Sequence, residues 1–286
     1  MHDITPPSVP PIAAVATVVA SARITPETSD EVRQIVLHVD DAAFDQPAGQ
    51  NLGILSPGPH PFGNPAHHRY YSIAGVKKSG LGVDLEILVR RCFYVDEVSG
   101  EQYPGEASNY LCDLAPGAQV ELTGPHRSPF QIPRESDSNL LMIGAGAGIA
   151  PFRALLQRIY TERGGWTGQV RLFFGARTGA DLLYMNTLND DLALYYDQAT
   201  FQAIQAIKRP LLGDEADALQ QGVADHAAEV WRLLQDPRTH VYLAGLKKVE
   251  TAFDAAMAQA AGSAEAWQQM RQQVIEDGRW SELTYQ

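Results

Sequence analysis

The amino-acid sequence predicts two domains, an N-terminal antiparallel β-barrel followed by a doubly wound α/β domain with a parallel sheet. Up to about residue 105, short β-branched runs separated by turns dominate, and a helical period is almost absent. From about residue 138, strand patterns alternate with helix patterns. A polar, proline-containing segment at 129–138 separates the strand-rich pattern from the alternating strand–helix pattern. We therefore expect a disordered lead at 1–12, a first domain at 13–136 and a second domain at 137–286.

The elements of the first domain follow from alternating apolar residues and from turn residues. The predicted strands are bounded by Gly, Pro or Asn and have the spacing of an antiparallel barrel. They lie at 13–24, 32–39, 52–55, 69–74, 84–89 and 119–123.

In the second domain, short continuous apolar runs predict buried parallel strands, and amphipathic segments between them predict the covering helices. The strands are expected at 140–144, 169–175, 201–207 and 240–245, and the helices at 151–163, 182–195, 216–234, 248–261 and 267–274. The end of the chain, 278–286, favours an extended segment.

Composition narrows the class of protein. The 286 residues are 45% hydrophobic and carry a net charge of -12, which allows two substantial cores and argues against a nucleic-acid partner. No run approaches the roughly 20 apolar residues of a membrane span, and the proline-rich start does not resemble a signal peptide, so a cytoplasmic protein is expected. Cys92 and Cys112 are too few and wrongly spaced for a zinc or iron–sulfur site. No metal site is predicted, and redox chemistry would need a bound cofactor.

A glycine loop follows the first strand of the second domain, with Gly144, Gly146 and Gly148 in a G-x-G-x-G pattern. Glycines let a ligand approach the backbone, and a helix that opens there directs unpaired amide hydrogens and partial positive charge at the loop. The loop is a candidate anion site. Its spacing is neither the usual G-x-G-x-x-G fingerprint nor a P-loop, so a tight turn without a ligand remains an alternative at this point.

Several ordered motifs across both domains carry a resemblance to a known family. The most specific is Arg69-Tyr70-Tyr71-Ser72-Ile73-Ala74, which matches an R-x-Y-S flavin motif. The others are the segment 105–111, Gly124-Pro125, the glycine loop, and the segments 173–177, 181–184 and 242–246. From about residue 13 to residue 285 the chain resembles the plant-type ferredoxin–NADP(+) reductase family. The resemblance implies an FAD-binding barrel and an NAD(P)-binding α/β domain.

Within the barrel, the resemblance assigns residues to FAD. Arg69 would form a charge-assisted fork with the pyrophosphate, and Tyr71 would stack on the isoalloxazine ring. The hydroxyl of Ser72 would meet flavin N5 and act as a catalytic group. The other implied FAD-binding residues are Tyr70, Ile73, Arg90, the adenine-stacking Tyr94, and Gly105, Ala107 and Ser108 at the start of a pyrophosphate-binding helix.

In the second domain, the resemblance assigns the glycine loop to the pyrophosphate or nicotinamide half of NAD(P)H. The implied nucleotide-binding residues are Gly144, Gly146, Gly148, Ile149, Pro151, Arg177, Gly245 and Leu246. Tyr285 is implied to cover the flavin where the nicotinamide must enter, and so to act in catalysis as a gate.

The chain departs from the family pattern at four positions. Ala145 and Ala147 replace two threonines. Ala244 replaces a cysteine beside the reacting nicotinamide carbon, and Leu283 stands where the family has a glutamate. Glu282 is one step out of phase, and a strand would point its side chain to the opposite face unless the tail shifts register. Slower turnover is therefore expected, and inactivity is not required.

The choice of nucleotide and partner depends on basic residues. Lys208 and Arg209 follow the third strand of the second domain and are candidates for holding a 2′-phosphate, which favours NADP(H) and leaves NAD(H) open. Candidate contacts for an acidic ferredoxin are the pairs Lys77-Lys78, Arg90-Arg91 and Lys247-Lys248. Each pair fits a solvated surface equally well.

The resemblance thus implies an FAD-dependent oxidoreductase. It would transfer a hydride between NADP(H) and flavin, and single electrons between flavin and ferredoxin or flavodoxin. One alternative is an NADH-dependent reductase component of an oxygenase system. Another is a flavin-binding electron-transfer subunit with impaired nicotinamide catalysis, motivated by the four departures.

Overall fold

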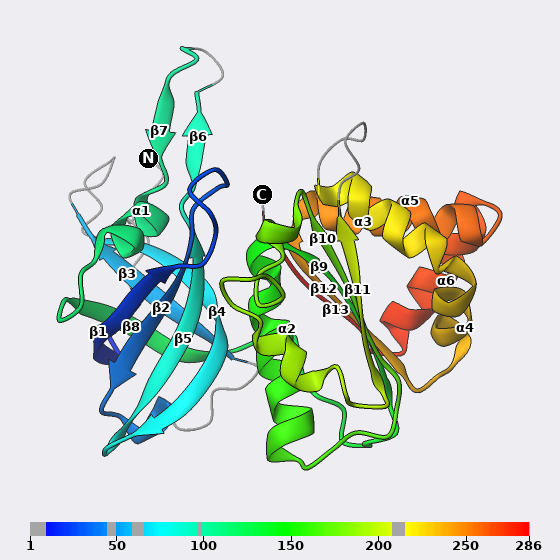
Figure 1. Ribbon diagram of the computed structural model, residues 1–286, viewed down its shortest axis with the longest axis horizontal. Helices are drawn as coiled ribbons and strands as arrows, with labels where there is room; N and C mark the ends of the chain where they lie inside the picture. Colours follow the sequence, from blue (N-terminus) through cyan, green and yellow to red (C-terminus); the bar gives the residue numbers. More distant parts are fainter. Residues whose placement is uncertain (1–9, 45–49, 59–65, 97–98, 208–214, 286) are drawn as a thin grey trace, which may run out of the picture. The chain divides into compact units, whose positions relative to one another are not determined.

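A computed structural model describes residues 10–44, 50–58, 66–96, 99–207 and 215–285. The chain divides into two compact units, Met1–Ser128 and Pro129–Gln286 (Figure 1). The first unit holds an antiparallel barrel and the second a parallel sheet, which confirms the predicted fold class. The functional domains at 13–136 and 137–286 stay a prediction, because the units are defined by packing alone. Residues 1–9 of the predicted lead lie outside the described residues, as do Lys208 and Arg209.

The barrel closes in the strand order β1-β2-β5-β4-β3-β8, and each neighbouring pair is antiparallel. Every predicted strand of this unit is present. Their bounds are β1 Ala14–Arg23, β2 Val32–Val39, β3 Gln50–Pro57, β4 Ala66–Ser79, β5 Gly82–Arg90 and β8 Gln119–Arg127.

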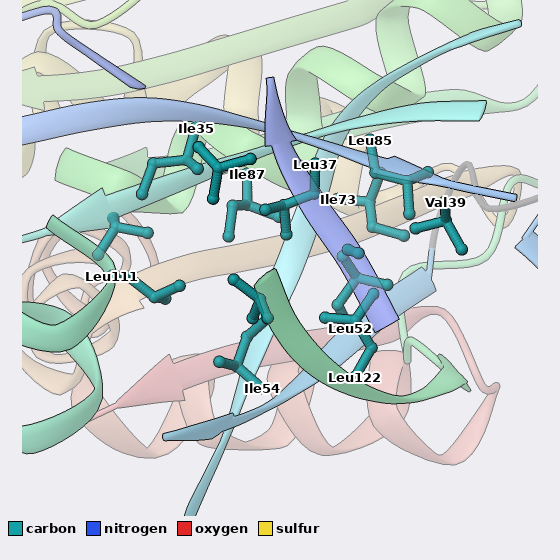
Figure 2. Close-up of a cluster of buried hydrophobic side chains, with 14 of the residues drawn as sticks. Ile35, Leu37, Val39, Leu52, Ile54, Ile73, Leu85, Ile87, Leu111 and Leu122 are labelled. Atoms are coloured by element: carbon teal, nitrogen blue, oxygen red, sulfur yellow. The ribbon is translucent and has the colours of Figure 1, made fainter. Parts of the chain in front are cut away.

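Alternation along the strands builds the barrel core. In β2, for example, Ile35, Leu37 and Val39 are buried while the residues between them are partly exposed, so one face of the strand points inward. These side chains meet the inward residues of β3, β4, β5 and β8 in one apolar cluster (Figure 2). The helix α1, Glu106–Asp113, adds Leu111 and Cys112 to the same cluster.

A short hairpin of β6, Phe93–Val95, and β7, Gln102–Pro104, was not predicted from the sequence. All of its strand residues are exposed, so no buried face creates an alternating pattern.

The parallel sheet of the second unit has the order β11-β10-β9-β12-β13. All four predicted strands are present, and the extended segment predicted at 278–286 supplies the fifth. The bounds are β9 Asn139–Ala145, β10 Val170–Ala176, β11 Phe201–Ile207, β12 Thr239–Leu246 and β13 Trp280–Tyr285. All neighbours are parallel, so every strand ends at the same edge of the sheet.

Helices cover both faces of this sheet, as the doubly wound class requires (Figure 1). One face carries α2, Ile149–Gln157, which continues as a π-helical turn at Arg158–Glu162. The other face carries α3 Glu215–Asp225, α4 Ala227–Gln235, α5 Lys247–Ala260 and α6 Ala264–Glu276. Among the described residues, no helix combines the length and apolarity needed to cross a membrane.

The helix predicted at 182–195 is wrong. This segment forms turns followed by a 3-10 helix at Asp191–Tyr195. The side-chain carbonyl of Asn186 accepts hydrogen bonds from the amides of Leu188 and Asn189, and Asn189 in turn accepts from the amide of Asp191. Asparagine side chains therefore satisfy amides that a helix would have used.

The helix predicted at 216–234 is broken into α3 and α4 at His226, which leaves the helical region at φ -115° and ψ 17°. The His226 ring packs edge-on against Phe173 of the sheet, and its Nδ1 lies 2.9 Å from the carbonyl oxygen of Gly222. The break thus rests on a tertiary contact that local sequence does not reveal.

Candidate functional site

The predicted nicotinamide-nucleotide residues leave the sheet at one edge. Gly146 and Gly148 follow β9, Arg177 follows β10, and Gly245 and Leu246 end β12. The strand order reverses between β9 and β12, because β10 and β11 lie on one side of β9 and β13 lies beyond β12. Ligands of doubly wound sheets bind in the crevice at such a reversal, outside the carboxyl ends of the strands. The glycine loop lies at that point.

Contact between two backbones explains why glycine is needed in these loops. A Cβ on Gly148 would lie 2.4 Å from the carbonyl oxygen of Ala244, and a Cβ on Gly245 would lie 2.9 Å from that of Ala145. A Cβ on Gly144 would meet the ring of Phe152 at 2.8 Å. The loops after β9 and β12 therefore pack backbone against backbone, with no room for side chains between them.

Gly146 differs from its neighbours. It has φ +57°, and nothing lies within 4 Å of where its Cβ would be. It begins a 3-10 turn, Gly146–Gly148, that leads directly into α2, whose N-cap residue Gly148 has no side-chain cap. The start of α2 has no side-chain cap, and the amide of its first residue, Ile149, donates to the carbonyls of Gly146 and Ala147 within the 3-10 turn. The loop therefore offers an anion the open side of Gly146 next to the positive end of a helix.

Some of the other predicted nucleotide-binding residues have side chains that pack inside the unit. Ile149 is fully buried and Pro151 is buried with it, so both pack into the unit. Ala244 is 1% exposed, and a side chain at this position points into the unit. Arg177 is exposed just beyond β10.

The C-terminal strand keeps the register that simple alternation predicts. β13 pairs in parallel with β12, which places Leu283 opposite Ala244 and Tyr285 opposite Leu246. Glu282 lies on the other face, where its carboxylate accepts a hydrogen bond from the indole of Trp280 at 3.3 Å. The register therefore does not shift to bring Glu282 to the face of Tyr285, whose side chain is 42% exposed.

In the barrel unit, the R-x-Y-S motif lies on β4 beside β3. The Ser72 hydroxyl donates to the side-chain carbonyl of Asn51 at 3.0 Å, and these two residues are directly paired across the strands. Tyr71 packs against the edge of the barrel core, and burial raises the pKa of its hydroxyl. Arg69 is exposed, whereas Ile73 is 1% exposed and points into the core. Only the backbone of Ile73 can face a ligand.

A polar cluster that the sequence did not reveal lies on the outside of the same strands. The Nε2 atoms of His68 and His126 lie 2.9 and 2.8 Å from the hydroxyl of Thr123, in the space left by the missing side chain of Gly53. Tyr70, 57% exposed, meets both imidazole rings edge-on. Burial and the neighbouring His126 and Arg69 lower the pKa of His68. Only the pairing of β3 with β4 and β8 could identify this cluster and Asn51.

The start of α1 is joined to the end of β5. The Ser108 hydroxyl donates to the carbonyl of Gly105 and accepts from the amide of Cys92, both at 3.2 Å. Gly105 is the N-cap of α1 and has no side-chain cap, while Ala107 is buried. Burial raises the pKa of the Cys112 thiol to about 11, so this cysteine is a packing residue.

The two arginines after β5 differ in their contacts. Arg90 pairs with Asp30. Arg91 donates to Glu31 at 2.7 Å, to Asn109 at 3.0 Å and to Asp113 at 2.8 Å, so it ties α1 to the barrel.

The β6–β7 hairpin carries the residue predicted to stack on adenine. The Tyr94 ring stacks on Tyr103, with centroids 5.5 Å apart and planes inclined by 22°. Tyr103 was not singled out in the sequence, because only the hairpin pairing brings it beside Tyr94.

The basic pairs predicted to steer an acidic partner also differ. Lys248 pairs with Glu215 at 2.8 Å and Lys247 pairs with Glu250. Lys77 and Lys78 are exposed on β4 near its turn into β5, and in the described part of the chain no ion pair involves them. They are the basic pair most available to a partner. Within the described residues, no group of three or more His, Cys, Asp or Glu side chains could hold a metal ion.

The second unit, a doubly wound sheet with a glycine loop at the strand reversal, has the architecture of a dinucleotide-binding domain. The family model described as the oxidoreductase NAD-binding domain matches residues 142–255, which include this loop. The chain is 34% identical over 263 residues to the ferredoxin–NADP reductase of Thermosynechococcus vestitus, and the match covers 89% of this chain and 68% of that protein. It is 33% identical to the ferredoxin–NADP reductase of Spirulina sp., with 89% and 88% covered.

The chain belongs to the ferredoxin–NADP reductase family, and the predicted family and enzyme class are confirmed. A solved structure of the ferredoxin-NADP+ reductase from Plasmodium falciparum matches with a TM-score of 0.70 and 17% identity, covering 95% of this chain and 96% of that one. That match shows the shared fold.

Proposed function

We propose that the protein is an FAD-dependent oxidoreductase that exchanges a hydride with NADP(H) and single electrons with ferredoxin or flavodoxin. The observation that carries the proposal is the glycine loop at the strand reversal, with Gly146 open beside the uncapped start of α2. We keep a cytoplasmic location as part of the proposal.

The residues of the barrel unit suit FAD in their chemistry. The uncapped α1 amides after Gly105 and the exposed Arg69 offer donors to a pyrophosphate. Tyr71 offers an aromatic face, and Tyr94, already stacked on Tyr103, offers a surface for adenine. When bound, FAD supplies hydride acceptance and one-electron transfer.

Ser72 is proposed as the catalytic hydroxyl of the barrel unit. Its hydrogen bond to Asn51 sets the resting direction of the hydroxyl proton. A hydroxyl can donate or accept by rotation, so Ser72 can serve both redox states of a cofactor that lies against it. Asn51 is proposed to position that hydroxyl.

In the second unit, the backbone of 144–148 is proposed to hold the nucleotide pyrophosphate, with Arg177 and Leu246 beside it. Tyr285 is proposed to occupy the nicotinamide position until the nucleotide displaces it. Lys208 and Arg209 are proposed to select the 2′-phosphate of NADP(H), and Lys77 and Lys78 to attract an acidic electron partner. The alanines at 145, 147 and 244 remove side-chain contacts to the nucleotide but leave the backbone site intact.

Rapid mixing tests this proposal. Purified protein is mixed anaerobically with NADPH or with NADH, and the flavin absorbance is followed. The proposal expects bleaching that is faster with NADPH. Faster bleaching with NADH would favour the oxygenase reductase alternative, and a stable flavin absorbance with both nucleotides would favour the electron-transfer subunit.

The partner is tested by the salt dependence of reduction. The second-order rate constant for ferredoxin or flavodoxin reduction should fall as salt is added, because Lys77 and Lys78 are exposed charges that salt screens. A rate constant that does not change with salt would contradict steering by these lysines.

A further inference from the structure

A cluster of charged and aromatic side chains holds the C-terminal strand β13 against α5 and α6. Its members are Glu250 and Asp254 of α5, Trp267 and Arg271 of α6, and Trp280 and Glu282 of β13, and we refer to them as the β13 clamp. Arg271 lies at the centre. Its guanidinium sits over the Trp280 ring at 4.9 Å from the centroid, donates to Glu250 and to Asp254, the latter at 2.8 Å, and lies 3.8 Å from Glu282.

The indole rings complete the clamp. Trp267 donates from Nε1 to Asp254 at 2.8 Å, and Trp280 donates to Glu282 at 3.3 Å. The rings of Trp267 and Trp280 have centroids 6.3 Å apart, and Phe253 lies against both. Trp280 thus contacts both an aromatic cluster and the Arg271 guanidinium.

The charges of the clamp depend on Arg271. Glu250 is 7% exposed, and burial alone would raise its pKa, but hydrogen bonds from Lys247 and Arg271 hold that pKa below its usual value. Burial raises the pKa of Asp254 despite the nearby Arg271. Removing Arg271 would leave Glu250 paired with Lys247 and Asp254 with the Trp267 indole, so each of these partly buried carboxylates would lose one cationic partner.

The clamp and Tyr285 lie on opposite faces of β13. Trp280 and Glu282 point to the helices, so Tyr285, three residues beyond Glu282, points to the other face. In the part of the chain that the structure describes, β13 is an edge strand whose one neighbour is β12. The ladder to β12 and the clamp both help to fix its position, and edge segments open locally at a lower free energy than central strands.

We propose that Arg271 is a positioning residue for Tyr285. By holding Trp280 and Glu282, it keeps β13 in register and keeps the Tyr285 ring opposite Leu246, where it competes with the nicotinamide. A looser strand lets the ring leave more easily. This inference rests on the proposed function, because it assumes that Tyr285 occupies the nicotinamide position.

Equilibrium binding to the FAD-loaded protein tests the inference. Two ligands are compared, NADP+ and adenosine 2′,5′-bisphosphate, which lacks the nicotinamide and does not compete with Tyr285. R271M should bind NADP+ about fivefold more tightly, at the low end of the coupling between linked sites, and bind the bisphosphate with unchanged affinity. R271K should shift NADP+ in the same direction by less, because lysine keeps the charge near Glu250 but loses the planar fork over Trp280.

Two further variants interpret the result. R238M is the control, since Arg238, an exposed arginine of the same unit, forms ion pairs with Asp137 and Asp236 and belongs to no part of the β13 clamp. Y285A tests the premise. In the double variant R271M/Y285A, the effect of R271M on NADP+ binding should disappear.

These outcomes distinguish a failure of the Arg271 role from a failure of the Tyr285 gate. Tighter NADP+ binding in Y285A with no change in R271M and R271K would overturn the role of Arg271 while leaving the gate intact. Equal changes for both ligands would also overturn it, because a general disturbance of the unit would then be responsible. No change in Y285A would overturn the gate itself, and the inference with it. If R271M fails to fold, R271K carries the same comparison.

Discussion

The two candidate binding regions are built by opposite means. In the barrel unit, side-chain hydrogen bonds hold the predicted FAD residues, as in Ser72 to Asn51 and Ser108 to Cys92. In the sheet unit, the predicted nucleotide loops pack backbone against backbone, with Gly148 beneath the carbonyl of Ala244. Deleting one side chain should therefore weaken the FAD region of the barrel only in part, whereas adding a single Cβ should disrupt the nucleotide loops of the sheet unit.

The architecture accounts for the difference. The register of β3 with β8 is irregular between Asn51 and Gly53, and that of β4 with β5 between Ile73 and Gly75. Such irregularities redirect side chains and occur often beside active sites. At the carboxyl edge of the parallel sheet, two neighbouring strands turn into helices at the same place, and the crowded backbones leave no room for a Cβ at Gly148 or Gly245.

The largest expected effect comes from G148A. Its new Cβ would lie 2.4 Å from the Ala244 oxygen, so one loop must move, which should destabilise the unit by about 3 kcal/mol and abolish nucleotide binding. G146A is the matched control. It meets no atom within 4 Å and should cost about 1 kcal/mol for its left-handed backbone alone. Denaturant unfolding of both variants provides the measurement, and equal losses would contradict backbone crowding as the cause.

A somewhat smaller effect is expected for R91M in the barrel unit. Arg91 ties Glu31, Asn109 and Asp113 together, and the loss of these charge-assisted bonds should reduce the free energy of unfolding by about 2 kcal/mol. R90M removes the exposed pair with Asp30, the one ion pair of Arg90 among the described residues, and should cost less than about 1 kcal/mol. If the two variants unfold at the same denaturant concentration, the side-chain network does not anchor α1.

S108A should have a milder effect with a specific consequence. Loss of the hydroxyl removes its hydrogen bonds to the Cys92 amide and the Gly105 carbonyl. The free energy of unfolding should fall by about 1 kcal/mol, and FAD retention should weaken roughly fivefold. Ser263 caps α6 by accepting from Ala266 at 3.1 Å, so S263A should cost a similar free energy without changing FAD retention. Dialysis followed by flavin absorbance compares them, and equal retention would mean that Ser108 serves only the helix.

The smallest effect is a contrast in pH dependence between the units. Hydrogen bonds to Asp84 and Asp40 raise the pKa of His38 in the barrel, so its stabilisation is present below about pH 6.5 and is lost as pH rises through the raised value. Burial and Arg279 lower the pKa of His240 in the sheet unit. The unfolded chain therefore binds this proton more readily than the folded protein, and stability falls as the pH drops below about 6.5.

The variants H38Q and H240Q test these two opposite pH dependences of stability. Relative to the wild type, H38Q should lose up to about 1 kcal/mol of stability at pH 5 and progressively less as the pH rises. H240Q should lose less stability than the wild type when the pH is lowered from 7 to 5. Thermal unfolding across pH measures both, and slopes of the same sign would contradict the assigned causes.

The sequence was sufficient for most elements because their signals are local. Alternating residues such as Ile35, Leu37 and Val39 can bury one face only as a strand, and continuous apolar runs such as 140–144 suit a parallel strand covered on both faces. The segment 182–195 was misread because its apolar spacing suits a helix while its asparagines bind the local amides. The exposed β6–β7 hairpin was missed because it carries no alternation.

By itself, the sequence determined the barrel, the parallel sheet, the glycine loop and the phase of Glu282, since each depends on residues close together in the chain. Only the tertiary structure decided which groups act together. Gly148 must be glycine because Ala244, far along the chain, places its carbonyl there. Likewise, the partner of Ser72 and the clamp around Arg271 exist through strand pairing and helix packing. Periodicity encodes which face is buried, but not which distant atom that face meets.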